Sequence, residues 1–297
     1  MTVRPTEALH PVAAGIQRAA PDAVLAALLE AQVAAAQAVR PALPALARAA
    51  DLCSAAIEGG HRLVYAGAGS SGLMALSDCL ELAGTFGIAP AQTAILFPGG
   101  AAALLHMTGA PEDDPRLAAS DLAPLALGPG DVVIAVSASG STPYTLEIAR
   151  LARGCGAAII GLANVADSPL LLAADLPVLL DTGPEPIAGS TRMGAGTAQK
   201  IALNMLSTLT GLKLGHVHEG YMINLVADNE KLAARAVRMV AALAGTDTER
   251  AADALSRVSG AVKPAILVAA GATPEAARAI LQTHRGHLGP ALAEVTG

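Results

Sequence analysis

The sequence predicts an α/β fold in which a five-stranded parallel sheet is flanked by helices and followed by a small helical C-terminal domain. Five short apolar runs, each bounded by Gly, Asp or Pro, are typical of strands buried on both faces; they lie at 63–67, 93–97, 132–137, 157–163 and 176–180. Helical patterns at 71–83 and 142–153 lie between these runs. Alternating strands and helices form parallel sheets with both faces covered.

The remaining elements are predicted to be helices. Residues 22–39 and 43–58 are rich in Ala and Leu at helical spacing, and Pro41 separates them. After the fifth strand the pattern is helical throughout, at 195–214, 227–244, 248–258 and 273–284. We therefore expect two domains, residues 1–240 with the sheet and residues 241–297 as a small helical domain.

Composition and charge exclude several classes of protein. A chain of 297 residues that is 53% hydrophobic can bury a substantial core, and its net charge of −6 without a basic run argues against nucleic acid as a partner. The three cysteines are odd in number and widely spaced, which predicts neither a disulfide framework nor a thiolate zinc site. No signal-peptide core and no uninterrupted run of 18 apolar residues is found, so we expect a cytoplasmic protein without a membrane segment.

Two serine-rich loops are candidates for binding an anion, because each follows a predicted strand and opens a predicted helix. The first, GAGSSG at 67–72, contains Gly69, Ser70 and Ser71, and the second, SASGST at 137–142, contains Ser137, Ser139, Ser141 and Thr142. Backbone N–H groups at helix starts and hydroxyl groups together bind a phosphate monoester without a lysine.

Other interpretations of these loops stay open. The pattern G-x-G-x-x-G also occurs in dinucleotide-binding proteins, but there an acidic residue follows the second strand, where this chain has Phe97-Pro98-Gly99-Gly100. Gly and Ser also form ordinary tight turns.

A third polar stretch, GSTRMGAGTAQK at 189–200, precedes a long apolar helix. Ser190, Thr191 and Lys200 are candidate ligands for a phosphosugar. The alternative is that Ser190 or Thr191 caps the helix and that Lys200 is solvated. His216 and His218 are expected to be polar surface residues rather than metal ligands.

The motifs GAGSSG, SASGSTPY, GSTRMGAGTAQK, LNMLST and ADNEKL resemble, in order and spacing, those of the N-acetylmuramic acid 6-phosphate etherases, a family within the sugar isomerase (SIS) superfamily of phosphosugar-binding proteins. The resemblance implies a SIS-type sheet, a homodimer with active sites near the subunit interface, and no metal or organic cofactor. It also implies that D-lactate is eliminated from the phosphosugar and that water then adds, yielding N-acetylglucosamine 6-phosphate.

The resemblance assigns two catalytic carboxyl groups. The family's general acid corresponds to Glu81, 14 residues after the first Gly of the GAG loop, and its second catalytic glutamate corresponds to Glu112. The chain departs from the family pattern at Leu73, Ser141 and Gly194, where the family carries basic residues. A pair of carboxyl groups suits the chemistry, because one removes the C2 proton of the opened sugar while the other protonates the departing C3 oxygen.

Two alternatives to an etherase remain at this point. A phosphosugar-binding regulator resembling the glucokinase regulatory protein would share the fold without catalysis, but the chain is too short for that protein's tandem domains. A phosphosugar isomerase would remove the same C2 proton and release no acid. Glu81 and Glu112 favour an enzyme over a regulator.

Overall fold

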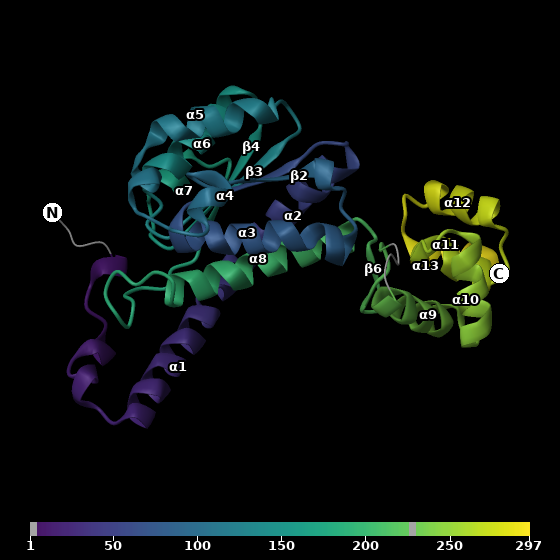
Figure 1. Ribbon diagram of the computed structural model, residues 1–297, viewed down its shortest axis with the longest axis horizontal. Coiled ribbons are helices and arrows are strands. Elements are labelled where there is room, and N and C mark those ends of the chain that lie inside the picture. Colours follow the sequence, from purple (N-terminus) through teal and green to yellow (C-terminus); the bar gives the residue numbers. More distant parts are fainter. Residues whose placement is uncertain (1–4, 226–229) are drawn as a thin grey trace. The chain divides into compact units, whose positions relative to one another are not determined.

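The computed structural model describes residues 5–225 and 230–297 and contains a five-stranded sheet (Figure 1). All its strand pairs are parallel, and the strand order is β2-β1-β3-β4-β5. The strands are β1 (Leu63–Gly67), β2 (Thr93–Leu96), β3 (Val132–Ser137), β4 (Ala158–Ala163) and β5 (Leu176–Leu179). The predicted fold class and all five predicted strands are confirmed.

The long predicted helices are also present, although residues 227–229 of the one expected at 227–244 lie outside the described residues. These helices are α1 (Pro21–Gln37), α2 (Leu43–Glu58), α3 (Gly69–Phe86), α6 (Pro143–Gly154), α8 (Gly194–Lys213), α9 (Glu230–Ala244), α10 (Thr248–Arg257) and α12 (Pro274–Thr283). Five helices were not predicted from the sequence, namely α4 (Gly100–Ala103), α5 (Pro115–Leu122), α7 (Pro169–Ala173), α11 (Val262–Ala269) and α13 (Leu288–Thr296). Each is nine residues or shorter, so its apolar period is too brief to stand out.

One face of the sheet is covered by α5 and α6. Side chains that alternate along the strands, such as Val64 and Ala66 of β1 and Val133 of β3, pack there against Tyr144 and Ile148 of α6 in one buried cluster. The α2 helix contacts β1, β3 and β5 and buries Leu46, Ala49, Ala50 and Cys53. Both faces are thus covered, as the apolar strands require.

The buried carboxylate of Asp78 connects α3 with β1 and α8. Asp78 of α3 is 3% exposed and accepts hydrogen bonds from the Tyr65 hydroxyl of β1 at 2.8 Å, the Asn204 amide at 2.8 Å and the Ser207 hydroxyl at 2.9 Å, the last two on α8. Burial and the neighbouring Asp78 raise the pKa of Tyr65 well above its ordinary value, so Tyr65 stays a donor. The network fixes α3 against β1 and α8.

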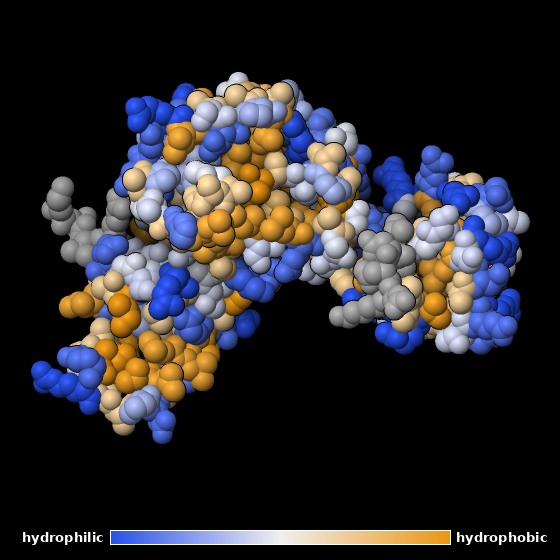
Figure 2. Space-filling model, in the orientation of Figure 1, coloured by the Kyte–Doolittle hydropathy of each residue, from blue (hydrophilic) through white to orange (hydrophobic). Residues whose placement is uncertain are grey.

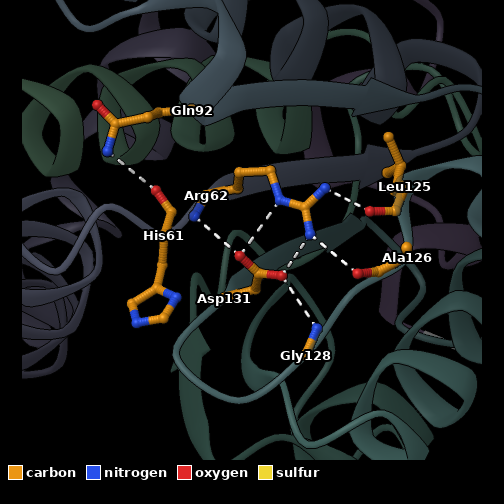
Figure 3. A network of polar contacts seen from close by, with 7 residues as sticks. All are labelled: His61, Arg62, Gln92, Leu125, Ala126, Gly128 and Asp131. Atoms are coloured by element: carbon orange, nitrogen blue, oxygen red, sulfur yellow. Dashed lines mark hydrogen bonds and ion pairs between the residues drawn. The ribbon is translucent and has the colours of Figure 1, made fainter.

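A second polar network lies at the amino ends of β1 and β3 (Figure 3). Asp131 accepts the Arg62 backbone N–H at 2.9 Å, the Arg62 guanidinium at 2.7 Å and the Gly128 N–H at 3.0 Å. The guanidinium also donates to the Ala126 carbonyl at 3.2 Å and to the Leu125 carbonyl. Burial alone would raise the pKa of Asp131, but these hydrogen bonds and the Arg62 charge outweigh it and lower the pKa.

The chain forms two compact units, one comprising residues up to Leu80 together with Pro90–Thr208, the other comprising Glu81–Ala89 and Leu209–Gly297. The second unit contains α9 to α13 and a short hairpin, β6 (Val217–His218) and β7 (Tyr221–Met222). The domain boundary predicted after residue 240 lies inside α9. The division into domains at that residue stays a prediction.

The second unit has its own apolar core and a group of partly buried basic residues. Its core includes Ile223, Val240, Leu255, Ile266 and Leu267. His216, which the sequence placed on the surface, is partly buried, and burial followed by the Lys263 charge lowers its pKa to about 4. Burial also lowers the pKa of Lys263 to about 8.

We expect Asp131→Asn to lower the free energy of unfolding by about 2–4 kcal/mol at pH 7, because it leaves the partly buried Arg62 charge without its counterion. Since the pKa of Asp131 is lowered in the folded state, its contribution is complete above the ordinary value of 3.8 and is lost as the pH falls through the lowered pKa. Urea unfolding of both proteins at pH 7 and pH 2 measures the effect.

The matched control is Asp253→Asn, whose carboxylate is 70% exposed and 3.9 Å from Arg257. This change should cost about 0.5 kcal/mol or less. A difference between wild type and Asp131→Asn that persisted unchanged at pH 2 would contradict the electrostatic explanation.

Candidate functional site

A polar cavity of about 290 Å³ lies where β1 and β3 end. Three separate parts of the chain beyond the two loops also contribute to the cavity: the N-terminal turn Pro5–Glu7, the 112–113 segment and the 189–191 segment. Its lining is Thr6, Glu7, Ala68, Gly69, Ser70, Ser71, Glu112, Asp113, Ala138, Ser139, Ser141, Thr142, Pro143, Gly189 and Thr191. The structure thus places both predicted serine loops on one cavity.

The glycines of the first loop serve different purposes. A Cβ on Gly72 would lie 2.6 Å from the Gly67 carbonyl and 2.6 Å from the Phe97 ring, so Gly67 and Gly72 allow α3 to pack closely on β1. Gly69 has φ +53°, and a Cβ there would lie 3.1 Å from Glu112 Oε2. Because Gly69 has no side chain, the Glu112 carboxyl group lies next to the start of α3. Where a dinucleotide-binding protein carries an acid, Phe97 packs against the loop.

The second loop is held by its own hydroxyl groups. Ser137 Oγ lies 2.8 Å from Thr142 Oγ1, and Ser139 Oγ accepts from the Ser141 N–H at 3.2 Å and the Ser141 hydroxyl at 3.0 Å. Ser71 Oγ accepts the Ala138 N–H at 3.2 Å and so joins the two loops. Ser137 is buried behind the lining and positions Thr142, the residue that precedes α6.

Glu112 lies in a short 3₁₀ turn, Ala110–Asp113. Burial, followed by the neighbouring Asp113 charge, raises its pKa. Glu112 and Gly69 also line a smaller cavity of about 160 Å³ whose other walls are largely apolar, including Phe97, Pro98, Ala103, Met107 and Pro111. Glu112 thus separates a polar cavity from an apolar one.

The third predicted segment contributes less than expected. Thr191 lines the cavity, but Ser190 does not, and Lys200 is exposed and donates to Asn204 Oδ1. Neither Ser190 nor Thr191 caps α8, because the buried Glu185 carboxylate accepts the N–H groups of Gly194 and Ala195, both at 2.8 Å. The sequence does not predict this cap, because Glu185 lies nine residues upstream of the helix.

Of the two predicted catalytic carboxyl groups, Glu112 lines the cavity. Glu81 is exposed on α3 and is absent from the lining, so its role as general acid stays a prediction. The lining also includes Glu7, which is not among the site residues predicted from the sequence. Within the described residues, no group of three or more His, Cys, Asp and Glu side chains could hold a metal ion.

The sheet order and the serine loops at its carboxyl edge define a SIS-domain protein, and the SIS domain family model matches residues 29–164. The N-acetylmuramic acid 6-phosphate etherase of Deinococcus radiodurans is 46% identical and covers 89% of this chain and 87% of the relative. The enzyme of the same name from Streptomyces avermitilis is 43% identical, covering 97% and 93%. This chain belongs to the N-acetylmuramic acid 6-phosphate etherase family, which confirms the resemblance.

A solved structure of a putative sugar-phosphate isomerase from Listeria monocytogenes is also similar, with a TM-score of 0.49 and 17% identity over 66% of this chain and 92% of that one. The relatives are named as enzymes acting on a sugar phosphate, which confirms the prediction of an enzyme that acts on a sugar phosphate. The alternative of a regulator is not favoured.

We expect the double variant Ser70→Ala, Ser141→Ala to weaken the binding of inorganic phosphate by roughly tenfold or more, because two hydroxyl groups that line the cavity are removed. Calorimetric titration measures the dissociation constant. Ser120→Ala, an exposed serine of α5, is the matched control and should bind phosphate as the wild type does. Unchanged phosphate affinity in a folded double variant would show that phosphate does not bind between the loops.

Proposed function

We propose that this protein is a cofactor-independent carbon–oxygen lyase that removes D-lactate from N-acetylmuramic acid 6-phosphate and adds water to yield N-acetylglucosamine 6-phosphate. The names of its relatives support the substrate. The observation that carries the proposal is a carboxyl group with a raised pKa, Glu112, in the same cavity as two serine loops.

In this proposal the 6-phosphate occupies the serine loops. Its oxygens accept hydrogen bonds from hydroxyl groups of Ser70, Ser141 and Thr142 and from N–H groups at the starts of α3 and α6. The sugar then extends toward Glu112. Phosphate contacts of this kind fix the substrate so that C2 and C3 lie next to the reacting carboxyl group.

Elimination and hydration follow from that placement. The Glu112 carboxylate takes the C2 proton, and the electron pair moves into the C1 aldehyde of the opened sugar. The C3–O bond breaks as the departing oxygen receives a proton, which the resemblance assigns to Glu81, and lactate leaves. Water then adds at C3 and a proton returns to C2, so the product carries one solvent oxygen.

The environment of Glu112 suits the role of base. A carboxylate in ordinary solution is a weak base at neutral pH, and burial strengthens it by raising its pKa toward the working pH. The same shift sets a pH limit, because Glu112 becomes protonated as the pH falls through its raised pKa and can then no longer accept the C2 proton.

We expect Glu112→Gln to lower kcat by roughly 10²-fold or more while the protein still binds the sugar phosphate, since the amide cannot accept the proton. In heavy-oxygen water the wild type should place the label at C3 and release lactate. The control is Glu58→Gln, an exposed glutamate at the end of α2.

Three outcomes separate the alternatives for the wild type. Labelled product with lactate supports the lyase. Exchange at C2 with formation of a ketose and no lactate identifies an isomerase. Tight binding of the sugar phosphate without exchange at C2 identifies a binding protein and overturns the proposal.

We also propose that the protein is a homodimer in which a second copy covers α1. Ala35 is the only buried residue of α1, whereas Leu25 is 64% and Leu29 is 62% exposed. Figure 2 shows this apolar surface over α1, at the lower left of the view. A membrane is the alternative partner for this surface.

By length and composition alone, the stretch Pro21–Glu58 could cross a membrane, but this is weak evidence for a membrane segment. The second half of that stretch, α2, packs on the sheet. A second copy of the chain is therefore the favoured partner of α1.

The variant Leu25→Glu, Leu29→Glu should convert a dimer to a monomer in light scattering, because two charges cannot be buried in an apolar interface. Leu172→Glu, at a leucine of α7 that is 73% exposed, should leave the dimer intact. A monomeric wild type, or a wild type that binds lipid vesicles through α1, would contradict the proposed dimer.

A further inference from the structure

The carboxyl group of Glu7 lines the same cavity as the two serine loops and Glu112, although it lies 60 residues before the first loop. Its position is fixed by its neighbour, Thr6, which is 1% exposed. The Thr6 carbonyl accepts the Gly189 N–H at 3.0 Å and ties the N-terminal turn to the 189–191 segment. The backbone anchoring thus belongs to Thr6, and the Glu7 side chain is free to face the cavity.

Gly189 makes room for this carboxylate. Gly189 has φ +74°, and a Cβ at this position would lie 2.9 Å from Glu7 Oε2. A larger residue there would meet the flexible end of the Glu7 side chain. The N-terminal turn and the 189–191 segment therefore meet beside this carboxyl group.

The charges around the cavity indicate what Glu7 can bind. The described residues of the lining include the carboxylates Glu7, Glu112 and Asp113, and no Lys or Arg. A carboxylate repels a phosphate dianion, so Glu7 cannot serve the phosphate. Its natural partners are groups that donate hydrogen bonds, and a sugar phosphate offers hydroxyl groups beside its phosphate.

We propose that Glu7 is a specificity-determining residue whose carboxylate accepts hydrogen bonds from hydroxyl groups of the sugar that the serine loops hold by its phosphate. The inference rests on the proposed function for the identity of the sugar. Glu7 makes the site prefer a phosphorylated sugar over phosphate alone, because inorganic phosphate has no group that reaches the carboxylate.

The test compares two ligands that differ by the sugar. N-Acetylglucosamine 6-phosphate and inorganic phosphate are titrated calorimetrically into the full-length wild type, Glu7→Ala and Glu7→Gln. We expect Glu7→Ala to bind the sugar phosphate roughly 10- to 100-fold more weakly, the loss typical of a charge-assisted hydrogen bond. Inorganic phosphate should bind as tightly as to the wild type or more tightly, because a carboxylate that repels it is removed. Glu7→Gln keeps one acceptor oxygen and should recover part of the affinity. Glu58→Ala is the control and should match the wild type for both ligands.

Steady-state kinetics provide an independent readout. For Glu7→Ala we expect the KM for N-acetylmuramic acid 6-phosphate to rise by the same factor as the dissociation constant of N-acetylglucosamine 6-phosphate. The kcat should stay within a few-fold of the wild type. An equal loss for both ligands would assign Glu7 to the shape of the phosphate site, and a loss of kcat with unchanged affinity would assign it to the chemical step. Either result, or no change at all, overturns the proposal.

Failure of the proposed function is a separate observation. If the wild type releases no lactate from N-acetylmuramic acid 6-phosphate, the lyase is overturned whatever the Glu7 variants do. If the wild type releases lactate but Glu7→Ala retains the full preference for the sugar phosphate over phosphate, only the role of Glu7 is overturned.

Discussion

The parallel pairing of β1 with β3 is the constraint on which the site depends. The register matches Gly67 with Val136, so the two strands end side by side and the loops that follow them share one edge of the sheet. The hydrogen bond from the Ala138 N–H to Ser71 Oγ forms only because of this adjacency. Two loops separated by some 65 residues in the sequence thereby become one binding surface, and the starts of α3 and α6 add their N–H groups to it.

The hydroxyl and N–H groups at the carboxyl edge of the sheet can bind an anion only if their positions are fixed. A buried network keeps α3 in place. Asp78 is bound by Tyr65, Asn204 and Ser207, so a shift of α3 would break three hydrogen bonds to a buried carboxylate. The Arg62–Asp131 pair plays the corresponding part at the amino ends of β1 and β3. Polar groups therefore fix both the amino ends of β1 and β3 and the helix that follows β1, while the apolar faces of the sheet supply most of the burial.

The sequence predicts the parts of this structure that depend on local pattern. Apolar runs located the five strands, and serine-rich turns after two of them located the cavity. It did not predict the Glu185 cap of α8, because a carboxylate nine residues before a helix has no local signature. Nor did it predict Glu7 at the cavity, because that placement arises from one backbone hydrogen bond between Gly189 and Thr6. Contacts between distant segments are set by tertiary packing, which a single sequence does not display.

The distribution of charge in the cavity joins binding to chemistry. Ser141 stands where the family pattern has a basic residue, so the cavity lining presents hydroxyl and N–H dipoles to an anion and keeps its full negative charges on Glu7, Glu112 and Asp113. The pKa of Glu112 is already raised by burial and by Asp113. A bound phosphate dianion adds negative charge to the same cavity, and a like charge raises the pKa of a nearby carboxyl group further. Glu112 is then a stronger base when the phosphosugar is present than when the cavity holds only water, so the charge that the serine loops bind also increases the basicity of the carboxylate beside them.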